Sequence, residues 1–190
     1  EIWEQAELDG GERHNFDCDI MDIIATGSSL YAAMFGGYFL EEQGISTRCI
    51  HASQANHYNL HQNVLAISQS GETKDIIGAV PDDFVCMTNT PDSMLYDMAY
   101  KKILLEAGPE YSVAATKTFT ASCMKLCGIV EPMTKQINNL MKRASAIKGI
   151  AKRIMGYDHF LFLGDRQNYP IALEGALKFK EVAYVHAEGM

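Results

Sequence analysis

Small hydroxyl-bearing residues and glycines cluster in three segments of this sequence, and such clusters can bind an anion. The segments are Thr26-Gly27-Ser28-Ser29, Ser68-Gln69-Ser70-Gly71-Glu72-Thr73 and residues 112–120. Backbone N–H groups at a helix start, Ser and Thr hydroxyls and the positive end of the helix dipole together bind phosphate. Helix capping by Ser70 and ordinary turn formation are the alternative. They account for one or two residues in each loop, so the density of polar residues favours an anion site.

A second group that could do chemistry is spaced along one helix. Lys178 follows Glu174 by four residues and precedes Glu181 by three, so all three share a helix face. A solvated stripe of ion pairs would have the same spacing. However, most neighbouring residues from 172 to 183 are apolar, and charges on a largely buried helix need partners or a function. A carboxylate beside an ammonium group could act as a general base.

The elements that must position these residues alternate between strand and helix patterns. Five short apolar runs, each bounded by Gly, Pro, Asn or Ser, predict the strands of a parallel sheet in an α/β fold: 20–25, 47–51, 64–67, 84–87 and 103–105. Helices are expected over 30–43 and 116–130, with a short one between 70 and 83. The first helix should turn its large apolar residues toward the core: Tyr31, Met34, Phe35, Tyr38 and Phe39. Ligands bind such sheets beyond the carboxyl ends of the strands, where the first two clusters lie.

The remainder of the chain predicts a connector followed by a second βα unit. Residues 135–153 repeat apolar residues at mostly helical spacing among Lys and Arg, which indicates a solvated helix or interdomain connector rather than a membrane surface, because aromatic anchors are lacking. A strand over 160–163 and a helix from Pro170 to Tyr184 then follow. We therefore expect a first domain over 1–130 with an N-terminal extension, a helical connector over 131–156, and the beginning of a truncated second domain over 157–190.

Composition excludes several classes of protein. The 190 residues are 47% hydrophobic and carry a formal net charge of −8, the wrong sign for a general nucleic-acid binder. No apolar run approaches the ~20 residues that span a bilayer. Five scattered cysteines without a CxxC pair fit a reducing compartment, so a cytoplasmic protein is expected. The histidines lack the spacing of a metal site, and Cys123 and Cys127 have no companion ligands, so no metal and no cofactor are expected.

Four motifs together resemble a known family. They are ATGSS at 25–29, ISQSGETKD at 67–75, SVAATKTFTA at 112–121 and YPIALEGALKFKEVAYVHAE at 169–188. They are similar, in the right order, to the sugar isomerase (SIS) domains of glucosamine-6-phosphate synthases, the glutamine:fructose-6-phosphate aminotransferases. The resemblance implies two SIS halves, each with a flavodoxin-like sheet between helices. This chain would contain the first half and the start of the second half.

The resemblance also implies roles for particular residues. The phosphate would be held by Ser68, Gln69, Ser70 and Thr73, with Gly27, Ser28 and Ser29 nearby. Val113 and the backbone around Ala115 would touch the sugar. Glu181 would move the proton between C1 and C2 during ketose-to-aldose isomerisation, with Lys178 beside it as a proton-transfer or electrostatic partner.

The implied activity is ketose/aldose isomerisation of a hexose 6-phosphate in an aminotransferase that makes glucosamine 6-phosphate. Its partners would be a glutaminase domain that supplies ammonia and a second subunit in a homodimer, without membrane or nucleic acid. The family's ring-opening His and Schiff-base Lys would follow Met190, so these 190 residues alone should bind the sugar phosphate and turn over little. Two alternatives stay open: a stand-alone SIS glucosamine-6-phosphate deaminase or fructosamine deglycase, and a non-catalytic sugar-phosphate sensor.

Overall fold

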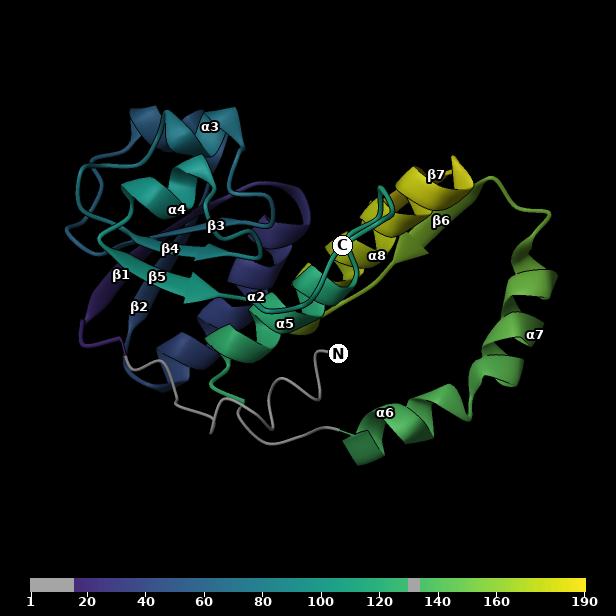
Figure 1. Cartoon of the computed structure of the whole chain (residues 1–190). Coiled ribbons are helices and arrows are strands. Elements are labelled where there is room, and N and C mark those ends of the chain that lie inside the picture. Colours follow the sequence, from purple (N-terminus) through teal and green to yellow (C-terminus); the bar gives the residue numbers. More distant parts are fainter. Residues whose placement is uncertain (1–15, 130–133) are drawn as a thin grey trace.

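The computed structural model describes residues 16–129 and 134–190. Its main element is a five-stranded parallel sheet with strand order β2-β1-β3-β4-β5 (Figure 1). The strands are β1 (Ile20–Ala25), β2 (Ser46–His51), β3 (Val64–Ser68), β4 (Val85–Thr88) and β5 (Lys101–Leu104). The predicted α/β class and all five predicted strands are confirmed, with shifts of one or two residues at the ends.

Both faces of the sheet are covered, as parallel sheets require. Helices α2 (Gly27–Glu42) and α5 (Lys117–Leu126) pack on one face over a core that includes Ile23, Leu65 and Met87. The 3-10 helix η1 (Ala52–His57) and the short helices α3 (Lys74–Ile77) and α4 (Met94–Met98) cover the other face. The predicted short helix is therefore α3, whereas η1 and α4 were not predicted.

The large side chains of α2 do not point into the core as expected. They are only half-buried, and the fully buried residues of α2 are Ala32, Ala33, Gly36, Gly37 and Leu40. A Cβ at Gly36 would overlap the side chain of Leu126, and one at Gly37 would crowd Thr47. The small residues let α2 lie close to α5 and β2, which leaves its aromatic side for other neighbours.

The connector is two helices rather than one continuous helix. They are α6 (Thr134–Met141) and α7 (Ala144–Ile154), separated at Lys142 and Arg143. No residue of α7 is buried. Figure 1 shows both helices extending away from the sheet. No helix among the described residues is long and apolar enough to cross a membrane.

The last segment forms a parallel β-α-β unit: β6 (His159–Phe162), α8 (Asn168–Ala183) and the unpredicted β7 (His186–Gly189). Phe179 of α8 packs edge-on against Phe160 and Phe162, with ring centroids 5.0 and 4.9 Å away. Pro170 lies in the first turn of α8, as predicted. Helix α8 also packs against α2, so this unit contacts the first part of the chain.

Candidate functional site

The first two hydroxyl clusters lie side by side at the carboxyl edge of the sheet. Strands β1 and β3 are neighbours, with Ala25 paired to Ile67 in register. The residues that follow them, 26–29 and 68–73, therefore leave the sheet at the same edge. Gly27 opens α2 with a φ of 53°, in the left-handed region that glycine adopts readily.

Residues 68–73, here called the hydroxyl loop, are held by their own side chains. Ser68 Oγ lies 2.9 Å from Thr73 Oγ1 and accepts a hydrogen bond from the Gly71 N–H at 3.1 Å. Ser70 Oγ accepts from the Glu72 N–H at 3.2 Å. Capping by Ser70, the alternative considered from the sequence, is wrong, because the N-cap of α3 is Thr73 and makes no side-chain cap bond.

The end of β4 supports this loop, which the sequence analysis did not anticipate. The hydroxyls of Thr88 and Thr90 both donate to the Gln69 carbonyl at 3.2 Å. Gly71 has a φ of 67°, and a Cβ there would collide with Ser93. The close approach of Ser93 is therefore sufficient to require glycine at position 71, and a bound ligand is not needed to explain it. The signal in the sequence was the run of small polar residues from 88 to 93, directly after a predicted strand.

A groove of about 660 Å³ opens beside the hydroxyl loop. Gln69, Asn89 and Thr90 line one side, and the segment from Glu106 to Glu110 lines the other. Asn89 links the two sides: it donates to the Gly108 carbonyl and accepts from the Ala107 N–H. Val113 and Ala115, the predicted sugar contacts, do not line this groove, and Val113 is 89% exposed.

The charged residues of α8 do come together. Lys178 Nζ lies 2.6 Å from Glu181 Oε2 and 3.5 Å from Glu174 Oε1. The side chains of Lys178 and Glu181 are 19% and 27% exposed, so the group is not a solvated stripe. Burial raises the pKa of Glu174 against the opposing effects of Lys178 and Ser28, and the negative charge of Glu181 raises it further. We call these three residues the α8 cluster.

Glu174 connects the α8 cluster to the first hydroxyl cluster. Besides Ser28, its charge acts on Tyr31 of α2 and on Cys123 of α5, and it contributes to the raised pKa of both groups after their own burial. Glu174 therefore lies where α8 packs on α2, close enough to α5 for its charge to act on Cys123. Its Oε2 is buried and has no hydrogen-bond partner among the described residues. A buried acceptor of this kind is costly unless a ligand or water satisfies it.

The structure therefore brings some of the predicted site residues together and separates others. Gly27, Ser28 and Ser29 start α2 beside the hydroxyl loop, which contains Ser68, Gln69, Ser70 and Thr73. Lys178 and Glu181 lie on α8, and their neighbour Glu174 on the same helix interacts with Ser28 at this edge. Within residues 16–129 and 134–190, no three His, Cys, Asp or Glu side chains gather as ligands for a metal ion.

A separate polar cluster that the sequence analysis missed lies in the amino-terminal half of β1. Asp22 is fully buried and accepts two hydrogen bonds from Arg48, both at 2.8 Å, and one from the His61 N–H at 2.7 Å. Burial alone would raise the pKa of Asp22, but these bonds and the charge of Arg48 lower it. The cluster fixes β1 to β2 and to the segment before β3, away from the carboxyl edge.

Comparisons with known proteins agree with this geometry. No protein-family model matches the chain. It is 34% identical over 192 residues to glutamine–fructose-6-phosphate aminotransferase (isomerizing) of Aquifex aeolicus, and 35% identical over 202 residues to that of Methanosarcina acetivorans. These alignments cover 88% and 89% of the chain. The chain is thus related to the glutamine–fructose-6-phosphate aminotransferases. The resemblance seen in the four motifs is confirmed.

The relationship covers only part of each aminotransferase. The chain spans 32% and 33% of the length of those two relatives. In structure it is similar to the C-terminal domain of glucosamine-fructose-6-phosphate aminotransferase from Francisella tularensis, with a TM-score of 0.83 and 27% identity over 98% of this chain and 64% of that one. A glucosamine-6-phosphate deaminase from Thermotoga maritima shares the fold, with a TM-score of 0.73 at 22% identity. The predicted SIS fold is therefore confirmed.

Proposed function

We propose that this chain binds a hexose 6-phosphate and carries the ketose/aldose isomerisation step of a glutamine–fructose-6-phosphate aminotransferase. The observation that carries the proposal is the junction at Glu174, which places a half-buried Lys–Glu pair on the helix that contacts Ser28. The pair would thereby act near the carboxyl edge of the parallel sheet, where such sheets bind ligands.

The phosphate would bind at the hydroxyl loop and the start of α2. Within the part of the chain that the structure describes, the hydroxyls of Ser68, Ser70 and Thr73 form hydrogen bonds with each other and with nearby turn amides alone. A phosphate oxygen can replace these neutral bonds by stronger, charge-assisted ones. Ser28 and Ser29, at the N-terminus of the 16-residue helix α2, would add the positive end of its dipole.

Proton transfer would use the α8 cluster. With ammonia bound as an imine at C2, the Glu181 carboxylate would take a proton from C1 and return it to C2. The C1 hydroxyl would lose its proton and the imine nitrogen would gain one, so that C1 becomes the aldehyde carbon and C2 carries the amine. Lys178, 2.6 Å away, would stabilise the carboxylate and the developing charge. Val113 and the backbone around Ala115 would contact the sugar, as the resemblance implies.

We also propose the wider setting of the site. Residues 1–130 would be the first SIS half with its N-terminal extension, 131–156 a connector, and 157–190 the start of the second half. A glutaminase domain would supply ammonia. All five cysteines are free thiols, which supports a cytoplasmic enzyme, and the sugar isomerase resemblance supports a homodimer.

Calorimetric titration of the chain with fructose 6-phosphate, glucosamine 6-phosphate and unphosphorylated fructose tests this proposal. We expect both phosphates to bind and fructose not to bind measurably. Ser70→Ala should weaken phosphate binding roughly tenfold or more, because one charge-assisted hydrogen bond contributes about 1.5–3 kcal/mol. Ser53→Ala in η1 is the matched control and should bind normally. Equal affinity for fructose would refute the phosphate site.

The two alternatives make different predictions. A stand-alone deaminase or deglycase would release ammonia from glucosamine 6-phosphate without glutamine, whereas the aminotransferase would consume glutamine. A sensor would need the hydroxyl loop but no buried Lys–Glu pair. The α8 cluster therefore favours an enzyme over a sensor.

A further inference from the structure

Residues 105–116, here called the β5–α5 loop, carry Val113 and Ala115 and contain no helix or strand. Val113 is 89% exposed, so packing of its own side chain does not fix its place. The start of the loop nevertheless has a defined conformation, with positive φ angles at Glu106 (54°) and Gly108 (69°). A positive φ costs free energy at a residue other than glycine and persists only where the surrounding structure holds it. Other parts of the chain must therefore hold this loop.

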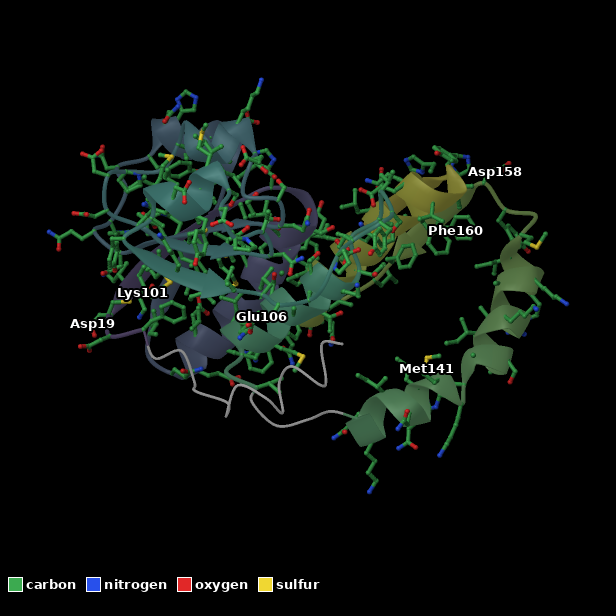
Figure 2. All side chains as sticks on the ribbon, viewed as in Figure 1. Asp19, Lys101, Glu106, Met141, Asp158 and Phe160 are labelled. Atoms are coloured by element: carbon green, nitrogen blue, oxygen red, sulfur yellow. The ribbon has the colours of Figure 1, made fainter. Side chains whose placement is uncertain are left out.

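Asn89, directly after β4, holds the beginning of the β5–α5 loop. Its side-chain amide donates to the Gly108 carbonyl at 2.8 Å, and its Oδ1 accepts from the Ala107 N–H at 2.9 Å. Ala107 itself is fully buried. Figure 2 labels Glu106 in the same stretch, beside α5, and its carboxylate lies 3.7 Å from Lys125 of that helix. The loop therefore leaves the sheet from a fixed point.

Glu110 closes the second half of the loop onto the start of α5. Its Oε1 accepts hydrogen bonds from the Thr116 N–H at 3.2 Å, the Thr118 N–H at 3.0 Å and the Thr118 hydroxyl at 3.5 Å. Thr116, the N-cap of α5, makes no side-chain cap bond of its own. The Glu110 carboxylate supplies the missing acceptor, and the helix dipole favours its negative charge there. Val113 and Ala115 lie within the segment that this contact closes.

Glu110 also lies beside the hydroxyl loop, since it is half-buried and lines the groove of about 660 Å³ together with Gln69. We propose that Glu110 is a positioning residue for the sugar. Its hydrogen bonds to the start of α5 hold the β5–α5 loop in the conformation in which Val113 and the backbone around Ala115 contact the sugar. This inference rests on the proposed function, because it requires a sugar phosphate at the hydroxyl loop.

Glu110 acts on the sugar part of the ligand, because the phosphate contacts proposed above belong to the hydroxyl loop. A loop that is already held in its binding conformation binds without the free-energy cost of ordering. When part of the population leaves that conformation, the apparent affinity falls by the fraction that remains. Loss of the Glu110 carboxylate should therefore weaken the binding of a sugar phosphate and leave the binding of phosphate alone unchanged.

The variant Glu110→Ala tests this with two ligands: fructose 6-phosphate, measured by calorimetry, and inorganic phosphate, measured by the NMR shifts of the Gly71 and Glu72 amides. The affinity for fructose 6-phosphate should fall roughly tenfold, as if about one loop in ten kept its binding conformation. The affinity for inorganic phosphate should stay the same. A purely structural role would alter both affinities or neither, and far-UV circular dichroism checks that the variant folds.

Two further variants separate hydrogen bonding from charge. Glu110→Gln keeps an oxygen that can accept the same hydrogen bonds, so its affinity for fructose 6-phosphate should stay within about threefold of the unmodified chain. Glu42→Ala removes the same charge from the exposed last turn of α2 and is the matched control, with both affinities unchanged. Amide hydrogen exchange at Thr116 and Thr118 should be faster in Glu110→Ala than in the unmodified chain, because both N–H groups lose their acceptor.

The inference and the proposed function fail in different ways. Normal binding of fructose 6-phosphate by Glu110→Ala, an equal loss of both ligands, or unchanged exchange at Thr116 and Thr118 would overturn the inference while the phosphate site stands. Glu110→Gln binding as weakly as Glu110→Ala would overturn it too, because the charge would then contact the ligand directly. An unmodified chain that binds neither ligand would refute the phosphate site itself, and the positioning role with it.

Discussion

Two buried carboxyl groups, Asp22 and Glu174, lie in opposite environments. Asp22 accepts hydrogen bonds from Arg48 and from His61, which more than offset its burial and lower its pKa. Glu174 has one oxygen without a partner among the described residues, and burial raises its pKa. A fully bonded carboxylate stabilises a fold, whereas an incompletely bonded one costs stability. The first is therefore structural, and the second belongs to the candidate site.

Asp22→Asn should lower the free energy of unfolding by about 2 kcal/mol at neutral pH, because charge-assisted hydrogen bonds to Arg48 are lost. The folded-state pKa of Asp22 lies below its ordinary value of 3.8. The contribution of Asp22 to the free energy of unfolding is therefore present above that value and disappears as the pH falls through the folded-state pKa. Urea unfolding at pH 7 and near pH 3 should show that the difference in unfolding free energy between the unmodified chain and the variant is smaller in acid. Exposed Asp82→Asn is the control, and a pH-independent difference would contradict the prediction.

Glu174→Gln should have the opposite pH dependence. Because the folded-state pKa of Glu174 is raised by burial, the native protein loses stability as the pH rises from the unfolded-state pKa through the folded-state one. The variant lacks this loss, so it should gain stability over the unmodified chain at pH 8 and differ little at pH 4. Thermal unfolding at both values checks this, with exposed Glu42→Gln as control. A destabilised variant at pH 8 would show that Glu174 is a satisfied ion pair.

Glu181→Gln should abolish isomerisation by the complete enzyme, because an amide cannot accept the proton from C1. Affinity for fructose 6-phosphate should stay within a few fold, since the phosphate binds elsewhere. Exchange of the C1 hydrogen with deuterated solvent, followed by NMR, measures the step directly. Full exchange in the variant would remove Glu181 from this role.

Among the elements, α2 occupies the central position. Its small residues face α5 and the sheet, its N-terminus carries Ser28 and Ser29, and its opposite side meets α8. The aromatic residues that periodicity assigned to the core are only half-buried, because the space against the sheet is too shallow for them. The carboxyl edge of the sheet and the α8 cluster thus depend on how closely this one helix packs.

Gly36→Ala tests the close packing of α2 against α5. The new methyl group would overlap Leu126, so we expect a loss of about 1–3 kcal/mol in unfolding free energy. Gly149→Ala in α7 is the matched control, since nothing lies within 4 Å of a Cβ there. It should stabilise α7 by about 0.5–1 kcal/mol through helix propensity. Urea unfolding followed by circular dichroism compares the two, and equal stabilities would contradict close packing at Gly36.

For the whole molecule, the sequence predicted the sheet better than the helices. Apolar strands such as 64–67 end sharply at polar residues, so their limits are clear, whereas the apolar repeat over 135–153 runs through the break at Lys142 and Arg143. Strand β7 was missed because His186 and Glu188 do not alternate with large apolar residues; Ala187 and Gly189 are small enough to pack on α8 instead.

The candidate site was predictable in its parts but not in its assembly. Spacing alone put Glu174, Lys178 and Glu181 on one helix face, and the structure confirms that they meet. Nothing local in the sequence shows that Glu174 would lie beside Ser28, or that Thr88 and Thr90 would hold the Gln69 carbonyl. Those contacts join distant segments and follow only from the order of the strands.

The contact between α2 and α8 sets an order of events during synthesis. A ribosome adds all five strands of the sheet, and with them the hydroxyl loop, before it adds α8. The phosphate site proposed above would therefore be made before Lys178 and Glu181, the groups proposed to move the proton. Ligand binding would then become possible before catalysis, and a ligand bound early could help the nascent chain reach its native fold.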